Sequence, residues 1–135
     1  LQGLARLYPG TEETLTTLKK QGFQLIFLSN CSREYMRAQK EHFQLERWFN
    51  GFYCCQDYDN MPKERIFAQF RDQYPGEYCV IGDRQSDLKV AQVWGLHSIG
   101  CAWGFGTTEE LSTAEQIAAT VTDIPQLLNN INMKY

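Results

Sequence analysis

A short apolar segment that runs into two aspartates limits the fold of this chain more than any other feature. Residues 78–82 read Tyr-Cys-Val-Ile-Gly, and Asp83 and Asp87 follow with three residues between them. A strand buried on both faces of a sheet has no reason to alternate apolar and polar side chains, so this run predicts a parallel strand. The loop after it therefore leaves the carboxyl edge of the sheet, where open α/β sheets bind ligands.

The two aspartates allow two interpretations. Carboxylates four residues apart at the start of a helix can converge on one divalent cation, and Mg²⁺ is usually held by one or two carboxylates together with a substrate phosphate. The alternative is structural, with Asp83 as a turn residue and Asp87 as a helix cap or first-turn acid, because both positions favour aspartate. The segment alone leaves both interpretations open.

Strand and helix patterns alternate along the rest of the chain. The apolar runs predict further strands over residues 23–28, 52–55, 97–103 and 117–121. Helical patterns cover residues 11–20, 33–43, 62–70, 87–94, 109–111 and 124–131. This alternation predicts an α/β fold, a Rossmann-like three-layer α/β/α arrangement with a mainly parallel sheet. With 135 residues, the chain is expected to form one domain over 1–135.

Composition excludes several classes of partner. The net charge of −3 offers no general attraction for nucleic acid or for an anionic membrane surface, and no apolar run approaches the roughly 20 residues that span a bilayer. The segment 1–6 has no extended apolar region of the kind found in a signal peptide. Five cysteines, an odd number lying mostly in apolar runs, favour a reduced, cytoplasmic protein.

Polar side chains also follow other predicted strands. Ser29 and Asn30 come where a strand meets a helix start, a place at which backbone N–H groups and a hydroxyl can hold phosphate oxygens. Lys63 supplies a cation at another loop. Taken singly, each has a structural alternative: Ser29 as a helix N-cap, Asn30 as a turn residue and Lys63 as a solvated surface lysine.

In this order the segments resemble the haloacid dehalogenase (HAD) superfamily, especially its phosphoglycolate-phosphatase-like branch. The second motif of that family is an apolar strand ending in Thr or Ser, which residues 25–30 match, and the third is a lysine, which Lys63 matches. The fourth is an apolar strand followed by Gly-Asp-x-x-x-Asp, which residues 80–87 match. The resemblance covers nearly the whole chain.

The resemblance implies a role for each residue. Ser29 would bind the transferring phosphoryl group with Asn30 beside it, and Lys63 would neutralise the phosphate and the nucleophile. Asp83 would ligate Mg²⁺, and Asp87 would ligate the same ion or orient its water. The family thus implies Ser29, Lys63 and Asp83 as catalytic residues, and a small phosphorylated metabolite as the substrate.

One family element is not found in the sequence. Members attack with an aspartate of an Asp-x-Asp motif at the end of a central first strand, and nothing upstream of Leu7 can supply that strand. Residues 57–59 form the only internal Asp-x-Asp, but they lie in the wrong order and have turn-like flanks. We therefore expect a partial HAD-like core with two unpaired strand edges, whose missing N-terminal segment and cap belong to a longer polypeptide or to another chain.

Two functions follow from these expectations. With the N-terminal segment present, the protein would be a Mg²⁺-dependent phosphatase, and without it the chain would be a catalytically inactive HAD-like binding or regulatory module. A response-regulator-like or nucleotide-binding domain is disfavoured, because the chain has no glycine-rich loop of the P-loop or dinucleotide-binding type.

Overall fold

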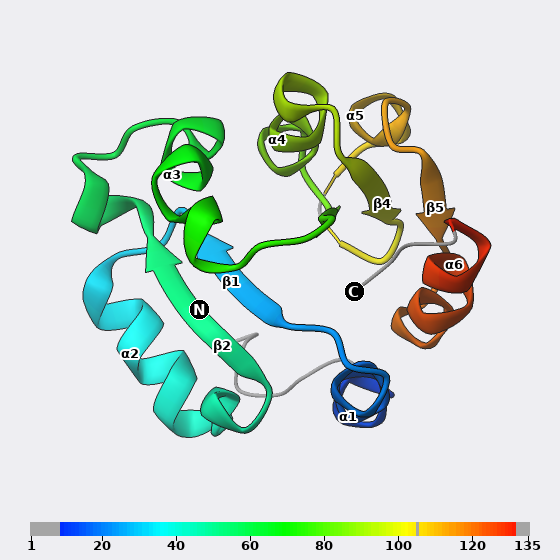
Figure 1. The fold of residues 1–135 in the computed structure, drawn as a ribbon, viewed down its shortest axis with the longest axis horizontal. Coiled ribbons are helices and arrows are strands. Elements are labelled where there is room, and N and C mark those ends of the chain that lie inside the picture. The colour runs from blue at the N-terminus through cyan, green and yellow to red at the C-terminus, as the bar shows by residue number, and fades with distance from the viewer. Residues whose placement is uncertain (1–8, 105, 132–135) are drawn as a thin grey trace.

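The computed structural model describes residues 9–104 and 106–131, and its elements alternate as the sequence predicts (Figure 1). The helices are α1 (Thr11–Lys20), α2 (Arg33–His42), α3 (Lys63–Phe70), α4 (Gln85–Trp94), α5 (Thr108–Leu111) and α6 (Ile124–Ile131). The strands are β1 (Leu25–Ser29), β2 (Phe49–Cys54), β3 (Cys79–Gly82), β4 (His97–Cys101) and β5 (Gln116–Ala118). None of the helices in the described ranges is long and apolar enough to cross a membrane.

Some predicted boundaries are wrong. The strand expected over 52–55 begins earlier, at Phe49, and Cys55 already belongs to the short 3₁₀ turn η3 (Cys55–Tyr58). The start was missed because Asn50 and Gly51 interrupt the apolar run, and the pairing with β1 is irregular at this point. The last strand is also shorter than expected, since residues 121–123 form a separate turn, η5 (Val121–Asp123).

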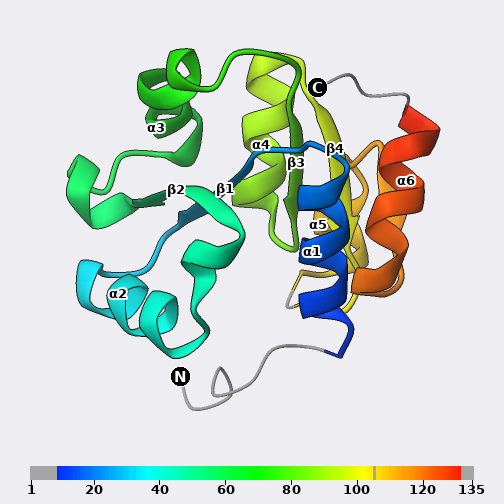
Figure 2. The same cartoon turned by 60° about the horizontal axis from the view of Figure 1, so that its bottom comes forward.

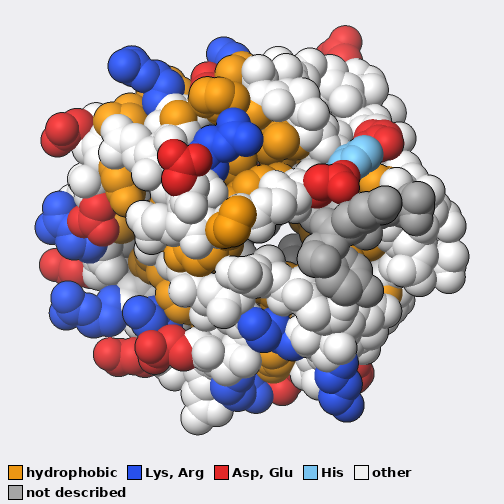
Figure 3. Space-filling model, in the orientation of Figure 1, with side chains coloured by type: hydrophobic (Ala, Val, Ile, Leu, Met, Phe, Trp, Pro, Cys, Tyr) orange, Lys and Arg blue, Asp and Glu red, His pale blue; other side chains and the backbone are white. Residues whose placement is uncertain are grey.

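The sheet consists of two separate parts. β1 pairs with β2, and β3 pairs with β4, which pairs with β5; every pairing is parallel. β1 and β3 therefore each use one edge only, and no strand among residues 9–104 and 106–131 pairs with the other edge of either. The predicted three-layer α/β class with parallel strands is confirmed. Figure 3 shows a hollow in the middle of the face seen in Figure 1.

Helices cover both faces of the strands. One cluster of buried side chains packs α1 and α6 against β4 and β5, and its members are Leu18, Phe23, Ile99, Ala118, Ile124 and Leu128. A second cluster packs α3 and α4 on the opposite face, and its members are Cys55, Ile66, Phe67, Phe70 and Val90. Figure 2 shows α2 and α3 on opposite sides of β1 and β2. The two clusters thus lie on opposite faces of the strands, and the second joins α3 to α4 across the break in the sheet.

Side chains beside the break are less buried than their composition predicts. All five residues of β1, Leu-Ile-Phe-Leu-Ser, are only partly buried. Ile81 in β3 is 39% exposed, which is unusual for an isoleucine inside a helix-covered parallel strand. Both strands thus have the composition of central strands and the exposure of edge strands, because each lacks a neighbour on one side within the described part of the chain.

Candidate phosphate and metal site

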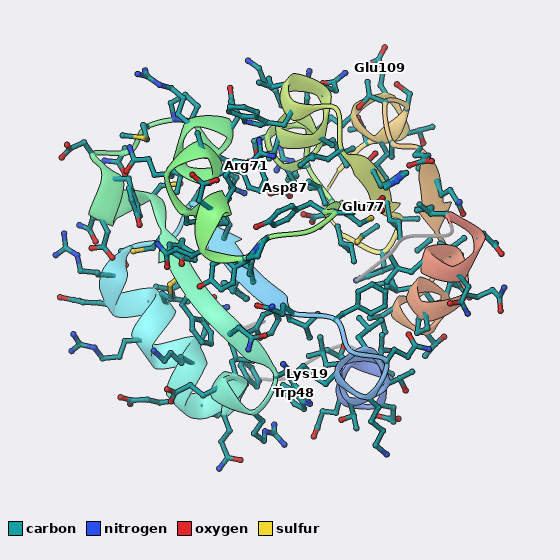
Figure 4. All side chains as sticks on the ribbon, in the orientation of Figure 1. Lys19, Trp48, Arg71, Glu77, Asp87 and Glu109 are labelled. Carbon is teal, nitrogen blue, oxygen red and sulfur yellow. The ribbon has the colours of Figure 1, made fainter. Side chains whose placement is uncertain are left out.

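The polar residues predicted at strand ends lie at the carboxyl edge of the strands. Ser29 is the last residue of β1, and Asp83 directly follows β3. Lys63 is the first residue of α3, and Asp87 lies in the first turn of α4, which begins two residues earlier than predicted. Figure 4 shows Asp87 near the middle of the molecule, beside the break in the sheet. Parallel strands place all these positions on one edge, as the sequence predicts.

An ion pair joins the third and fourth motifs. The Lys63 ammonium lies directly against one carboxylate oxygen of Asp87, Oδ1, and both side chains are largely shielded, with exposures of 9% and 18%. The expectation for an isolated lysine, a solvated surface position, is therefore wrong for Lys63. A shielded ammonium requires a partner, and the carboxylate of Asp87 provides it. The pair also links α3 to α4, which belong to different halves of the sheet.

The second oxygen of Asp87 has a structural role. Its Oδ2 accepts a hydrogen bond from the backbone N–H of Arg84 (3.4 Å), which closes the loop before α4. Gly82 allows this arrangement, since a side chain there would overlap the Asp87 carboxylate. One oxygen of Asp87 therefore supports the helix start, as the structural interpretation predicts, and the other contacts the Lys63 ammonium. That Asp87 also binds a metal stays a prediction.

Asp83 is held by two glycines of the loop after β4. A side chain on Gly104 would overlap the Asp83 carboxylate, and one on Gly106 would overlap its backbone carbonyl. The sequence alone suggests only a flexible glycine-rich loop here. The structure shows that these glycines allow the loop backbone to approach Asp83 closely.

Ser29 and Asn30 have different partners. The Ser29 hydroxyl oxygen accepts a hydrogen bond from the backbone N–H of Cys31 (3.2 Å), and α2 is capped instead by Ser32. The N-cap interpretation of Ser29 is therefore wrong. The side-chain oxygen of Asn30 accepts a hydrogen bond from the Cys55 thiol (3.0 Å), which ties the end of β1 to the end of β2.

Cys55 lies between these polar groups. Burial raises the pKa of its thiol, the positive charge of Lys63 opposes that rise, and the negative charge of Asp87 adds to it. Cys55 thus donates a hydrogen bond to Asn30 and lies near enough to Lys63 and Asp87 to be influenced by their charges. Ser29 is the last residue of β1 and Asp83 directly follows β3, so the two residues lie at strand ends on the two sides of the break. That a single phosphate and its metal bridge these two residues stays a prediction.

The internal Asp-x-Asp sequence serves a different purpose. Asp57 forms an ion pair with Arg33 at the start of α2 and accepts a hydrogen bond from the Cys54 thiol (3.1 Å). The thiol bond and the arginine both lower the pKa of Asp57. Asp59 follows η3 with a positive φ of 54°, a turn conformation. These contacts support the sequence interpretation of residues 57–59 as a turn.

The donor set fits a hard divalent cation only in part. Asp83 and Asp87 supply carboxylate oxygens, the ligands that Mg²⁺ prefers. Among the residues that the structure describes, no group of three or more His, Cys, Asp or Glu side chains is arranged to hold a metal. Further ligands would therefore come from phosphate, from water or from a segment outside these residues, which is how Mg²⁺ is commonly bound.

One residue at this edge was not predicted. Glu110 accepts a hydrogen bond from the backbone N–H of Gln85, inside the segment between the two aspartates. The sequence contains a partial signal, since Thr107-x-x-Glu110 has the form of a helix capping box. The long-range contact with Gln85 is visible only in the structure.

The chain is an α/β protein with parallel strands, helices on both faces, and acids and a lysine at the carboxyl edge. Open α/β sheets commonly bind ligands at that edge. The chain belongs to the haloacid dehalogenase-like hydrolase family, whose model matches residues 2–101. This confirms the resemblance seen in the motifs, including its phosphoglycolate-phosphatase-like character.

Individual relatives agree with this assignment. The chain is 27% identical to a phosphoglycolate phosphatase of Mannheimia succiniciproducens over 110 residues, covering 78% of this chain and 49% of the relative. It is 31% identical to a 5'-nucleotidase of Pseudomonas aeruginosa over 110 residues, covering 78% and 50%. The crystal structure of a predicted phosphatase from Clostridium acetobutylicum matches with a TM-score of 0.81 and 28% identity, covering 93% of this chain and 61% of that one. The chain thus spans about half the length of the curated relatives it matches.

Proposed function

We propose that the polypeptide to which this chain belongs is a Mg²⁺-dependent phosphatase of small phosphorylated metabolites. The observation that carries the proposal is the shielded Lys63–Asp87 ion pair beside Asp83, at the carboxyl edge where α/β folds bind ligands. The free cysteines are consistent with the cytoplasm as its compartment.

Phosphoryl transfer depends mainly on positioning and on stabilising negative charge. Asp83 and Asp87 would hold Mg²⁺, which when bound offsets charge on the phosphoryl oxygens. Lys63 would add a second positive charge, and the Ser29 hydroxyl and the Asn30 amide would donate hydrogen bonds to the phosphoryl group. The family's nucleophile is an aspartate that these residues do not supply, so we assign it to a segment outside them.

The names of the relatives point to a class of substrate. One relative is named a phosphoglycolate phosphatase and another a 5'-nucleotidase, and both names describe hydrolysis of a phosphate monoester. We therefore propose a phosphate monoester as the substrate class. The organic part of the substrate would be recognised by residues outside the matched core.

We further propose that one extended segment, from the same polypeptide or from another chain, occupies the break between β1 and β3. Among the residues that the structure describes, each of these strands has one edge without a pairing partner, and Ile81 of β3 is exposed. A strand that paired with both edges would satisfy backbone N–H and C=O groups and would cover apolar side chains.

This proposal predicts a difference in stability. A polypeptide that includes the preceding segment should melt on the order of 10 °C higher than the chain of 135 residues, because several apolar side chains become buried. Differential scanning calorimetry of the two proteins measures the difference. A matched polypeptide whose added segment carries prolines, and so cannot form a central strand, should lose the gain. Equal melting temperatures for all three would contradict the proposal.

The function itself is tested by hydrolysis of a generic aryl phosphate by the longer polypeptide. We expect turnover with Mg²⁺ and none after removal of the metal by a chelator, with recovery when Mg²⁺ is restored. Turnover that persists in chelator would show that the metal site is not part of the reaction. Phosphate binding without any turnover would instead favour the inactive binding module.

A further inference from the structure

The Glu110 carboxylate joins α5 to the loop that carries the two aspartates. Its Oε2 accepts hydrogen bonds from the backbone N–H of Gln85 (3.1 Å) and from the side-chain Nε of Arg84 (3.1 Å). Its Oε1 accepts a hydrogen bond from the backbone N–H of Thr107 (3.3 Å), whose hydroxyl oxygen in turn accepts one from the backbone N–H of Glu110 (3.1 Å). One side chain therefore completes the cap of its own helix and holds two consecutive residues between Asp83 and Asp87.

The surroundings of Glu110 favour its charged form. The side chain is 21% exposed and forms an ion pair with Arg84. The Gln85 N–H, then the Arg84 side chain, then the Thr107 N–H lower the pKa of the carboxyl. Hydrogen bonds to a carboxylate are shorter and roughly twice as strong as those to a neutral acceptor. Glu110 is thus suited to fix the backbone at residues 84 and 85.

The loop between the aspartates is restrained at several points. Gly104 and Gly106 lie against Asp83, and the Asp87 carboxylate accepts a hydrogen bond from the backbone N–H of Arg84. Glu110 is the restraint that comes from a separate helix. Without it, residues 84 and 85 would lose their hydrogen bonds to α5. The relative placement of the two carboxylates would then be less well defined.

We propose that Glu110 is a positioning residue for the metal site, fixing the placement of the Asp83 and Asp87 carboxylates through Arg84 and Gln85. The inference rests on the proposed function, because it assumes that these carboxylates bind Mg²⁺. Removing a residue that orients the ligands of a metal commonly lowers metal affinity or activity by about 10–100-fold. Glu110 should therefore affect the Mg²⁺ requirement more than it affects substrate binding.

The test uses the longer polypeptide, with aryl phosphate hydrolysis measured across a Mg²⁺ titration and Mg²⁺ binding measured by calorimetry. Glu110→Ala should raise the half-saturating Mg²⁺ concentration about tenfold or more, while KM for the aryl phosphate at saturating Mg²⁺ changes by less than about twofold. Glu110→Gln should fall between Glu110→Ala and the wild type, because its carbonyl oxygen still accepts a hydrogen bond. Glu109→Ala is the matched control, since it removes the same charge from a side chain that points outward at the rim (Figure 4).

The possible results distinguish a failure of the positioning role of Glu110 from a failure of the proposed phosphatase function. If wild type responds to Mg²⁺ and Glu110→Ala has the same half-saturating concentration, the positioning role is wrong and the proposed function stands. A fall in melting temperature and in turnover at every Mg²⁺ concentration, with an unchanged half-saturating value, would show a purely structural role and would also overturn the inference. A wild-type protein that neither binds nor requires Mg²⁺ would overturn both proposals.

Discussion

Asp83→Asn should lower kcat/KM of the longer polypeptide for an aryl phosphate by about 10²–10³-fold or more, the size of effect seen when a group that stabilises transition-state charge is removed. The amide keeps the shape of the carboxylate and removes its charge, so the proposed Mg²⁺ site would lose one of its two carboxylates. The melting temperature should change far less than the kinetics, because the amide keeps the shape of the side chain. Steady-state kinetics and a thermal melt measure the two effects.

Asp59→Asn is the matched control for this substitution. Asp59 is exposed in a turn with a positive φ of 54°, a conformation that asparagine also tolerates. It carries the same change of charge outside the proposed site and should leave both kinetics and melting temperature unchanged. Equal kinetics for Asp83→Asn and Asp59→Asn would contradict the assignment of Asp83 to the metal.

Lys63→Met should reduce both stability and activity. Methionine fills a similar volume but leaves the shielded Asp87 carboxylate without its cation, and breaking such a pair from one side costs about 3–5 kcal/mol when burial is complete. The Asp87 side chain is 18% exposed, so we expect about 2–3 kcal/mol, measured by urea unfolding. Activity should fall at least about 10²-fold, since positive charge near the phosphoryl group is lost.

Two further variants separate this effect from a general loss of packing. Lys89→Met removes a lysine that is 59% exposed and lies 3.7 Å from Glu64, so it should cost less than about 1 kcal/mol. The double variant Lys63→Met with Asp87→Asn should recover much of the stability lost in Lys63→Met, because no uncompensated charge remains. A double variant with additive losses would show that the ion pair does not couple the two helices.

Much of the fold could be predicted from local patterns. The apolar run that ends at Gly82 and the one that ends at Ser29 lack polar alternation, which is typical of strands covered on both faces. Both are strands in the structure. The start of β2 could not be predicted in the same way, since Asn50 and Gly51 have low strand propensity and are placed by pairing with β1. The break in the sheet followed from the family resemblance, and no local pattern indicates it.

The sequence predicted that the candidate site residues follow the ends of strands. It did not predict which of these residues contact one another. The position of Lys63 in sequence favours a surface residue, and only the approach of α3 to α4 brings it to Asp87, 24 residues away. Ser29 looked like a helix cap, yet Ser32 performs that role. Glu110 could be recognised as a capping residue, but its contact with Gln85 depends on where α5 packs. Contacts between residues far apart in the sequence, such as Lys63 with Asp87, cannot be predicted from local residue patterns.

The most direct test of the site is a crystal structure of the longer polypeptide with Mg²⁺ and inorganic phosphate. We expect Mg²⁺ about 2.1 Å from a carboxylate oxygen of Asp83, with Asp87 beside it. The phosphate should lie within about 3 Å of both the Ser29 hydroxyl and the Lys63 ammonium, at the edge where β1 and β3 end. Metal and phosphate bound elsewhere, with Asp83 and Lys63 contacting neither, would contradict the proposed site.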